Sequence, residues 1–188
     1  MNDRSATTGR ADAQRNRQRL IEVARRMLAD GGAKVALEAI AREAGVGIGT
    51  LYRHFPTRET LVEAVYRAEL SRLCDSAAEL LVDTSARIAL RAWMDRFADY
   101  VAAKREIADA LRAVIASGAV TATGARTELA AAVQTLLDAG VAERTVRPDV
   151  RADDVVASLV GIFLAAGQPE QATRMMDLLM DGLVVRNT

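Results

Sequence analysis

The sequence contains few cysteines, prolines and aromatic residues, and these shortages exclude several kinds of architecture. Its 188 residues include a single cysteine, Cys74, which excludes an internal disulfide and a cysteine-based zinc site. We interpret Cys74 as a small, half-buried apolar residue. Three prolines leave long uninterrupted segments, and abundant alanine, leucine, arginine and glutamate favour helix over strand. The predicted fold class is all-α with an aliphatic core, because only 4% of the residues are aromatic.

Long apolar runs and catalytic clusters are missing as well. No stretch reaches the roughly 18 apolar residues of a membrane span, and the N-terminus does not resemble a signal peptide. We therefore expect a cytoplasmic protein with no membrane partner. One histidine, one cysteine and no phosphate-binding glycine loop after a strand leave nothing from which to build an active site, a metal site or a cofactor site.

Charge is balanced over the whole chain but unevenly distributed along it. Residues 1–72 carry 13 Lys and Arg against 9 Asp and Glu, whereas residues 73–188 carry 12 against 16. A basic front end on an acidic body predicts a phosphate-binding surface near the N-terminus. A disordered basic tail without function is the alternative for the first residues.

Apolar residues recur at intervals of three and four, which predicts a series of amphipathic helices. Residues 1–11 are polar and aperiodic, and are expected to form a flexible basic arm. Glycines and prolines separate the segments that follow. The predicted helices cover residues 12–30, 36–44, 48–54, 57–73, 85–103, 107–117, 126–138, 153–166 and 169–185.

One stretch, GVGIGTLYRHFPTRETL at residues 45–61, departs from this helical pattern. Two short helices joined by a glycine-containing turn, behind a longer helix, are typical of a helix-turn-helix unit. Gly45 is expected at the turn with a positive φ, where a β-carbon would cost energy. Leu51 and Phe55, four residues apart, are expected to bury one face of the second short helix.

The opposite face of that helix carries residues that are unusual for plain solvent contact. They are Ile48, Gly49, Tyr52 and Arg53, flanked by Thr50 and His54. Such a face suits the major groove of DNA, because a glycine permits close approach and an isoleucine can contact a thymine methyl group. The polar side chains can reach base edges or phosphates.

Residues 15–66, and above all the run IAREAGVGIGTLYRHFPTRETLVEAVY, resemble the DNA-binding domain of the TetR/AcrR family of bacterial transcriptional repressors. The resemblance implies an all-helical homodimer of about nine helices, with a three-helix DNA-binding domain followed by an effector-binding and dimerisation domain. The implied parts are the basic arm at 1–11, the DNA-binding domain at 12–56, a connecting helix at 57–73 and the effector and dimerisation domain at 74–188.

The resemblance also implies roles for single residues. Thr50, Tyr52 and His54 fall on positions that contact DNA, and Ile48 and Gly49 fall on positions that often read bases. The basic residue at the start of the next helix, Arg58, falls on a position that usually binds a phosphate. Packing of Tyr52, a structural hydrogen bond of His54 and solvation of Arg58 are the alternatives.

Two departures from the family pattern bear on DNA binding. Lys34-Val35-Ala36 stand where the family usually has a capping residue, so that a phosphate contact there must come from Lys34 or from the backbone. Gly47-Ile48 stand where the family often has Ser-Lys, which removes one basic contact. DNA binding is then expected to depend more on the arginine-rich first helix and arm, so that loss of Arg4 and Arg10 would flatten its salt dependence.

The last two predicted helices are apolar on nearly every side, and such helices must be buried on every side. We expect a two-fold dimer in which they form a four-helix bundle; a single internal helix without a dimer is the alternative. The predicted interface residues are Val155, Leu159, Ile162, Phe163, Met175, Met176 and Leu179.

An aromatic stripe on the helix at 85–103 has two interpretations. Trp93, Phe97 and Tyr100 lie at helical spacing and pack either as core or as the wall of an apolar effector pocket. Three residues of later helices are expected to face them: Leu111, Val114 and Leu136. The overall prediction is a homodimeric repressor that a small apolar effector releases from double-stranded operator DNA. The alternative is a DNA-binding regulator without a small-molecule ligand.

Overall fold

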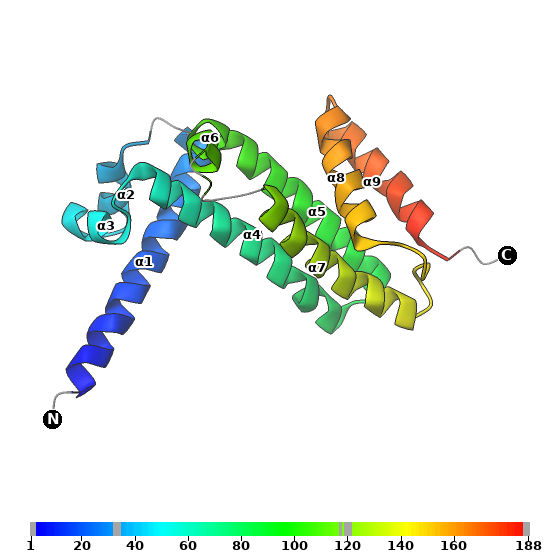
Figure 1. Cartoon of the computed structure of the whole chain (residues 1–188), viewed down its shortest axis with the longest axis horizontal. Helices are drawn as coiled ribbons and strands as arrows, with labels where there is room; N and C mark the ends of the chain where they lie inside the picture. The colour runs from blue at the N-terminus through cyan, green and yellow to red at the C-terminus, as the bar shows by residue number, and fades with distance from the viewer. Residues whose placement is uncertain (1–2, 32–34, 117, 119–121, 186–188) are drawn as a thin grey trace. The chain divides into compact units, whose positions relative to one another are not determined.

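The computed structural model describes residues 3–31, 35–116, 118 and 122–185, and these residues form nine helices and no strand. Figure 1 shows their arrangement. The helices are α1 (Asp3–Gly31), α2 (Leu37–Glu43), α3 (Ile48–His54), α4 (Arg58–Asp83), α5 (Ala86–Glu106), α6 (Ala108–Ala116), α7 (Ala122–Ala142), α8 (Ala152–Ala165) and α9 (Pro169–Leu183). No helix in the described part of the chain is both long enough and apolar enough to cross a bilayer. The predicted all-α class is confirmed.

The helix boundaries agree with the sequence pattern best where apolar residues and turn residues coincide. Helix α3 has the predicted bounds, and α9 begins at Pro169 as expected. Helix α1 instead begins at Asp3, so that the backbone from residue 3 to residue 11 is helical rather than an irregular arm. This segment contains Ser, Thr and Gly, which are weak helix formers, so its helix follows from continuation of the helix behind it, because extending a helix costs less than starting one. Helix α4 likewise continues ten residues beyond its predicted end, to Asp83.

The chain folds as two compact units. The first consists of Met1–Ala68 and Ala103–Val120, and the second of Glu69–Ala102 and Thr121–Thr188. Two of the three boundaries fall inside helices, α4 and α5, and none coincides with the expected boundary between residues 73 and 74. Helix α6 therefore belongs to the same unit as α1, α2 and α3, whereas the family resemblance implied that it lies in the domain at 74–188.

The first unit surrounds a small aliphatic core. Helix α1 packs against α2 and α3, which pack against each other. Its buried side chains include Leu20 and Leu28 of α1, Ile40 of α2 and Leu51 of α3. Each of these four is at most 1% exposed, so the short helices are fixed by burial rather than by their own stability, which is marginal at seven residues.

The second unit is a bundle in which α7 packs against α8 and α8 packs against α9. The end of α9 is joined to the connector before α8 by an isolated antiparallel bridge between Val146 and Val184. Around it, the Arg147 amide donates to the Leu183 carbonyl at 2.9 Å, and the Val185 amide donates to the Thr145 carbonyl at 3.1 Å. These bonds fix the C-terminal end of α9.

Candidate DNA-binding site

The turn between α2 and α3 has the geometry of a tight glycine turn. Gly45 has a φ of 66°, as predicted, and its amide donates to the Arg42 carbonyl at 3.0 Å. The next amide, that of Val46, donates to the Ala41 carbonyl at 3.0 Å, which closes the end of α2. Ala41 is 2% exposed, so only a small side chain fits where the helices cross. Backbone bonds and close packing therefore define the angle of α3.

Helix α3 has one buried face and one exposed face. Leu51 and the C-cap residue Phe55 are buried, at 0% and 1% exposed. Ile48 and Tyr52 are 39% and 43% exposed, values that are high for large apolar side chains in a folded unit. Across this face, Gly49, Arg53, Thr50 and His54 take the expected places: the first two are exposed and the last two are half-buried.

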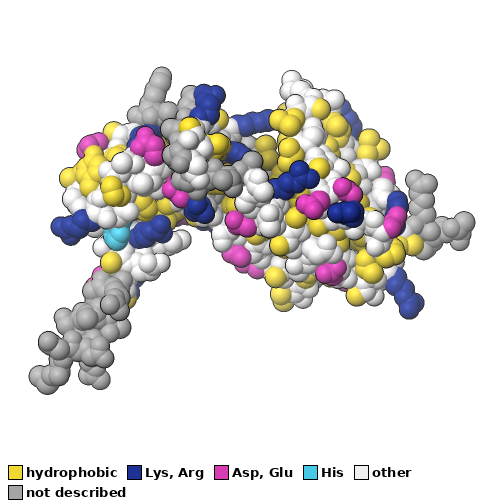
Figure 2. Space-filling view, viewed as in Figure 1, with side chains coloured by type: hydrophobic (Ala, Val, Ile, Leu, Met, Phe, Trp, Pro, Cys, Tyr) yellow, Lys and Arg dark blue, Asp and Glu magenta, His cyan; other side chains and the backbone are white. Residues whose placement is uncertain are grey.

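The exposed face of α3 is open and free of acidic residues. A β-carbon added at Gly47 or Gly49 would meet no atom within 4 Å, so another molecule can approach the backbone there. Within the described residues, neither the Tyr52 hydroxyl nor the Arg53 guanidinium has a hydrogen-bond or ion-pair partner. Figure 2 shows the histidine of α3 between Lys or Arg side chains on the surface of the first unit. This surface is basic and offers unused donors.

Two predicted phosphate ligands have different outcomes. Lys34 lies outside the described residues. Arg58, the first residue of α4, turns inward, and its Nη1 donates to the carbonyl of Val35, just before α2. Its Nη2 is buried and has no hydrogen-bond partner among the described residues. In this conformation, the guanidinium of Arg58 makes an intramolecular hydrogen bond.

Two arginines of α1 also contact the helix-turn-helix, and the sequence pattern did not single them out. Arg19 Nη1 lies 3.5 Å from the carbonyl oxygen of Ala44, the C-cap residue of α2. The guanidinium carbon of Arg17 lies 5.2 Å from the centroid of the Phe55 ring. A sequence signal existed in the arginine-rich start of the first helix, but its arginines were interpreted only as phosphate ligands.

The aromatic stripe of α5 is packed as core. Trp93 and Phe97 are 0% and 1% exposed, with ring centroids 5.9 Å apart, and Tyr100 follows at 6.1 Å from Phe97. The Trp93 indole N–H donates to the carbonyl of Leu73 at 2.9 Å, which satisfies the one polar group of this side chain. Phe163 of α8 lies 5.8 Å from Phe97 and completes the cluster.

The other predicted pocket residues are divided between the two units. Leu136 of α7 is buried in the second unit, with the aromatic stripe. Leu111 and Val114 are buried too, but they belong to α6 in the first unit. The six predicted residues therefore do not form one site within a single unit.

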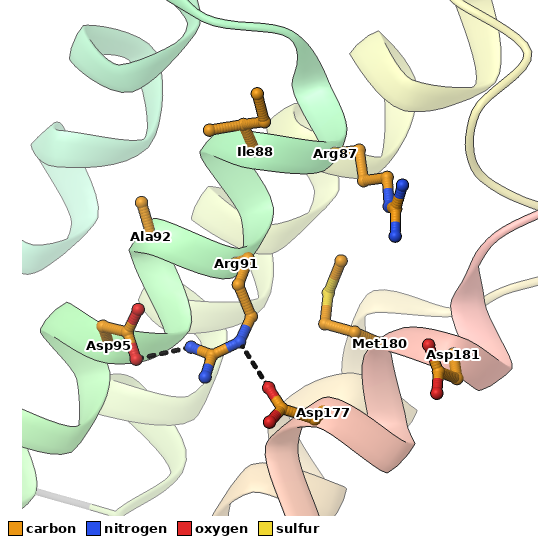
Figure 3. Close-up of a pocket in the computed structure, with 8 residues that line it drawn as sticks. All are labelled: Arg87, Ile88, Arg91, Ala92, Asp95, Asp177, Met180 and Asp181. Atoms are coloured by element: carbon orange, nitrogen blue, oxygen red, sulfur yellow. Dashed lines mark hydrogen bonds and ion pairs between the residues drawn. The ribbon is translucent and has the colours of Figure 1, made fainter. Parts of the chain in front are cut away.

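A groove of about 520 Å³ lies on the second unit between α5 and α9 (Figure 3). Arg91 of α5 crosses it: Nε donates to Asp177 of α9 at 3.0 Å, and Nη1 donates to Asp95 one turn along α5. Burial lowers the pKa of Arg91, but its bonds to Asp95 and Asp177 raise it, and the net shift is upward. Arg87, Asp181 and exposed Ile88 also line the groove, which thus combines charged side chains with apolar surface.

Most of the predicted dimer-interface residues need correction. Four of them are buried within this single chain: Val155, Leu159, Ile162 and Met176. A side chain that already packs inside its own protomer cannot be the surface that a second copy covers. Phe163, Met175 and Leu179 are half-buried. The apolar surface of α8 and α9 consists instead of Val160, Leu164 and Leu178, which are 43%, 81% and 72% exposed, with exposed Gly161 beside them.

Two family models match the chain. Residues 20–65 match the model described as bacterial regulatory proteins, tetR family, and therefore contain α2, α3 and the Gly45 turn. Residues 85–185, more than half of the chain, match the model described as transcriptional regulator SbtR-like, C-terminal domain. Together, these matches cover both compact units.

Solved structures resemble the chain over nearly its whole length. A TetR transcriptional regulator from Streptomyces coelicolor is 47% identical with a TM-score of 0.79, over 91% of this chain and 99% of that one. A TetR transcription regulatory protein from Mycobacterium vanbaalenii is 36% identical with a TM-score of 0.73, over 94% and 99%.

A curated relative resembles only the front of the chain. This HTH-type transcriptional regulator of Staphylococcus aureus strain USA300 is 40% identical over 62 residues, which are 32% of this chain and 34% of that protein. The chain therefore matches about a third of the length of that relative.

Proposed function

Because the chain belongs to the TetR family of transcriptional regulators, we propose that it is a homodimeric repressor which a small-molecule effector releases from a palindromic operator. DNA-binding transcriptional regulation is the activity of this family, which is not a family of enzymes. Binding to a chromosomal operator would place the protein in the bacterial cytoplasm.

The exposed face of α3 is the observation that supports DNA reading most directly. Ile48 and Tyr52 are exposed on a helix whose opposite face is fully buried, and Gly49 leaves the backbone open to close approach. In the major groove, Ile48 would contact a thymine methyl group, and Tyr52 and Arg53 would donate to base edges or phosphates. Thr50 and His54, half-buried at the flanks of this face, would contact the DNA backbone.

The dimer is supported by the apolar surface of α8 and α9. Leu164 and Leu178 leave a large part of their side chains in water on neighbouring helices of one unit. A two-fold axis would pair this surface with itself, and Gly161 would allow the helices to approach closely. Two copies of α3 would then meet half-sites about 34 Å apart, or a multiple of that distance, on one face of DNA.

Release by an effector rests on the family resemblance, and the packing of the second unit sets a condition on it. An apolar effector in the aromatic cluster would have to displace rings that now contact one another, and compete with Leu73 for the indole of Trp93. The closed cluster favours a second candidate, a DNA-binding regulator without a small-molecule ligand. Trp93 is the chain's single tryptophan, so a change in its fluorescence reports entry of a compound into the aromatic cluster.

Selection of duplexes from a random library, followed by fluorescence anisotropy on the enriched sequence, tests the proposal. We expect an enriched palindrome that binds two protomers, with an affinity at least about 10³-fold above that for an unrelated duplex at 150 mM salt. Equal affinity for both duplexes, lost together as salt rises, would contradict specific repression. A change of Trp93 fluorescence that accompanies release of the duplex would separate the effector-controlled regulator from the second candidate.

A further inference from the structure

Three arginines of the first unit contact the backbone or the core of the helix-turn-helix: Arg17 and Arg58 are half-buried, and Arg19 is exposed. Arg58 approaches from α4, and Arg17 and Arg19 approach from α1. The three contacts fall at or beside the ends of α2 and α3, and the carbonyl that Arg19 contacts is one of the terminal carbonyls of α2, which lack helical partners. Their residue type and their basic region would otherwise make them candidates for binding DNA phosphates.

Arg58 ties the start of α2 to the start of α4. Its Nη1 donates to the Val35 carbonyl, and no side chain caps α2 at Ala36. Its Nη2 is buried, and a phosphate oxygen cannot reach a buried nitrogen without displacing the side chain. Displacement would leave the Val35 carbonyl without this charged donor, and bonds to charged groups are among the stronger hydrogen bonds. The bond therefore holds Arg58 away from the DNA.

Arg19 and Arg17 fix the other ends of the two short helices. Arg19 donates to the carbonyl of Ala44, one of the terminal carbonyls of α2, directly before the Gly45 turn. Arg17 lies over the ring of Phe55, the C-cap residue of α3, in a cation–π contact. Because Phe55 is 1% exposed, the contact between Arg17 and its ring joins α1 to the buried end of α3.

We propose that Arg58, with Arg17 and Arg19, positions the recognition helix α3 and that none of the three neutralises a DNA phosphate. This inference rests on the proposed DNA-reading role of α3. On this proposal, arginines that do not contact DNA determine how well α3 fits its specific DNA sequence. Exposed residues such as Arg53 instead bind phosphates and give the affinity its salt dependence. A positioning arginine and a phosphate ligand have different salt signatures, because only the phosphate ligand releases counterions.

Arg53 offers a matched control for Arg58. Both are arginines of the first unit, but Arg53 is exposed on α3 and has no partner among the described residues. The Arg58→Met and Arg53→Met variants each keep an aliphatic side chain and remove one charge. Affinities would be measured by anisotropy between 50 and 300 mM salt on the duplex enriched from the random library and on one unrelated 30-base-pair duplex.

The two variants should differ in the slope of log affinity against log salt. Arg53→Met should lower the magnitude of the slope by about 0.9 on both duplexes. Arg58→Met should leave the slope unchanged but reduce the preference for the enriched duplex by about tenfold, because the start of α2, against which α3 packs, is no longer tied to α4. Arg58→Lys restores the charge without the planar fork, and should recover that preference only in part. A slope lowered by about 0.9 in Arg58→Met, with full recovery in Arg58→Lys, would overturn the proposal.

Two further measurements separate positioning from mere stability and from failure of the proposed function. Binding is measured at least 15 °C below each variant's unfolding midpoint, so that every variant is folded. If the arginine only stabilises the fold, the preference between the two duplexes stays unchanged under this condition. An unchanged preference would therefore also overturn the proposal. If Arg58→Met does not fold, Arg19→Gln carries the same expectations, because Arg19 is largely exposed. If the wild type enriches no sequence, the proposed function fails, while the slope on the unrelated duplex still decides whether Arg58 binds phosphate.

Discussion

Replacing Leu164 or Leu178 by glutamate should separate the proposed dimer without unfolding the protomer. Leu164 is 81% exposed in the single chain and Leu178 is 72% exposed. Full burial of a leucine side chain stabilises by about 1.5–3 kcal/mol, and each residue occurs twice in a two-fold interface. Leu164→Glu therefore costs about 2.5–5 kcal/mol of association free energy, which raises the dimer Kd by roughly two to four orders of magnitude.

Sedimentation velocity over a concentration series measures this Kd, and thermal unfolding checks the protomer. We expect Leu164→Glu and Leu178→Glu to sediment as monomers at concentrations where the wild type is a dimer. Their intrinsic protomer stability should change by no more than about 0.5 kcal/mol, because the side chains are exposed. Val82→Glu is the matched control, since Val82 is 78% exposed but lies on α4. Wild-type Kd values in both leucine variants would refute the assignment of the interface to this surface.

Three further predictions concern the fold. Gly140→Ala would place a β-carbon 2.4 Å from Val146 Cγ2 and 2.9 Å from Val146 Cβ, and should lower the free energy of unfolding by about 1–3 kcal/mol in chemical denaturation. In a Val146→Ala background only the Cβ contact remains, so the loss should be smaller there, and an equal loss would contradict the clash. Gly45→Ala meets no close contact, so its cost of about 1 kcal/mol should come from the positive φ alone and be smaller in Gly45→Asn. Burial, together with the charges of Glu128 and Asp75, raises the pKa of the Cys74 thiol to about 11. The thiol therefore stays protonated at pH 8, and its alkylation in the native protein should be about 100-fold slower than in the unfolded chain. Equal alkylation rates in the native and unfolded protein would refute this prediction.

The helix-turn-helix could be predicted from the sequence because several local signals agree there. Gly45, the apolar spacing of Leu51 and Phe55, and the stop at Pro56 together define the bounds and the two faces of α3, and the structure has the same bounds and faces. The family of the chain followed from the same residues. The turn residues and the buried residues of this unit lie within a few positions of one another. A single sequence is therefore enough to predict the turn and the buried face.

Features that depend on tertiary packing could not be predicted in the same way. An arginine in a basic region looks the same whether it faces solvent or a carbonyl 23 residues away, as Arg58 does. A helix that is apolar all round does not reveal which face its own chain covers. The residues chosen for the dimer therefore included Val155 and Leu159, which pack inside the protomer, and omitted Leu164 and Leu178. Helix ends without apolar residues, such as the start of α1, gave no periodic signal.

Comparing the sequences that wild type and Ile48→Ala enrich from a random duplex library tests the central claim most directly. The account predicts that Ile48→Ala relaxes the preference at one thymine position in each half-site by about 1 kcal/mol, while affinity for an unrelated duplex and its salt slope stay the same. Unchanged enrichment at every position, measured with a folded variant, would contradict the claim that the exposed face of α3 reads bases.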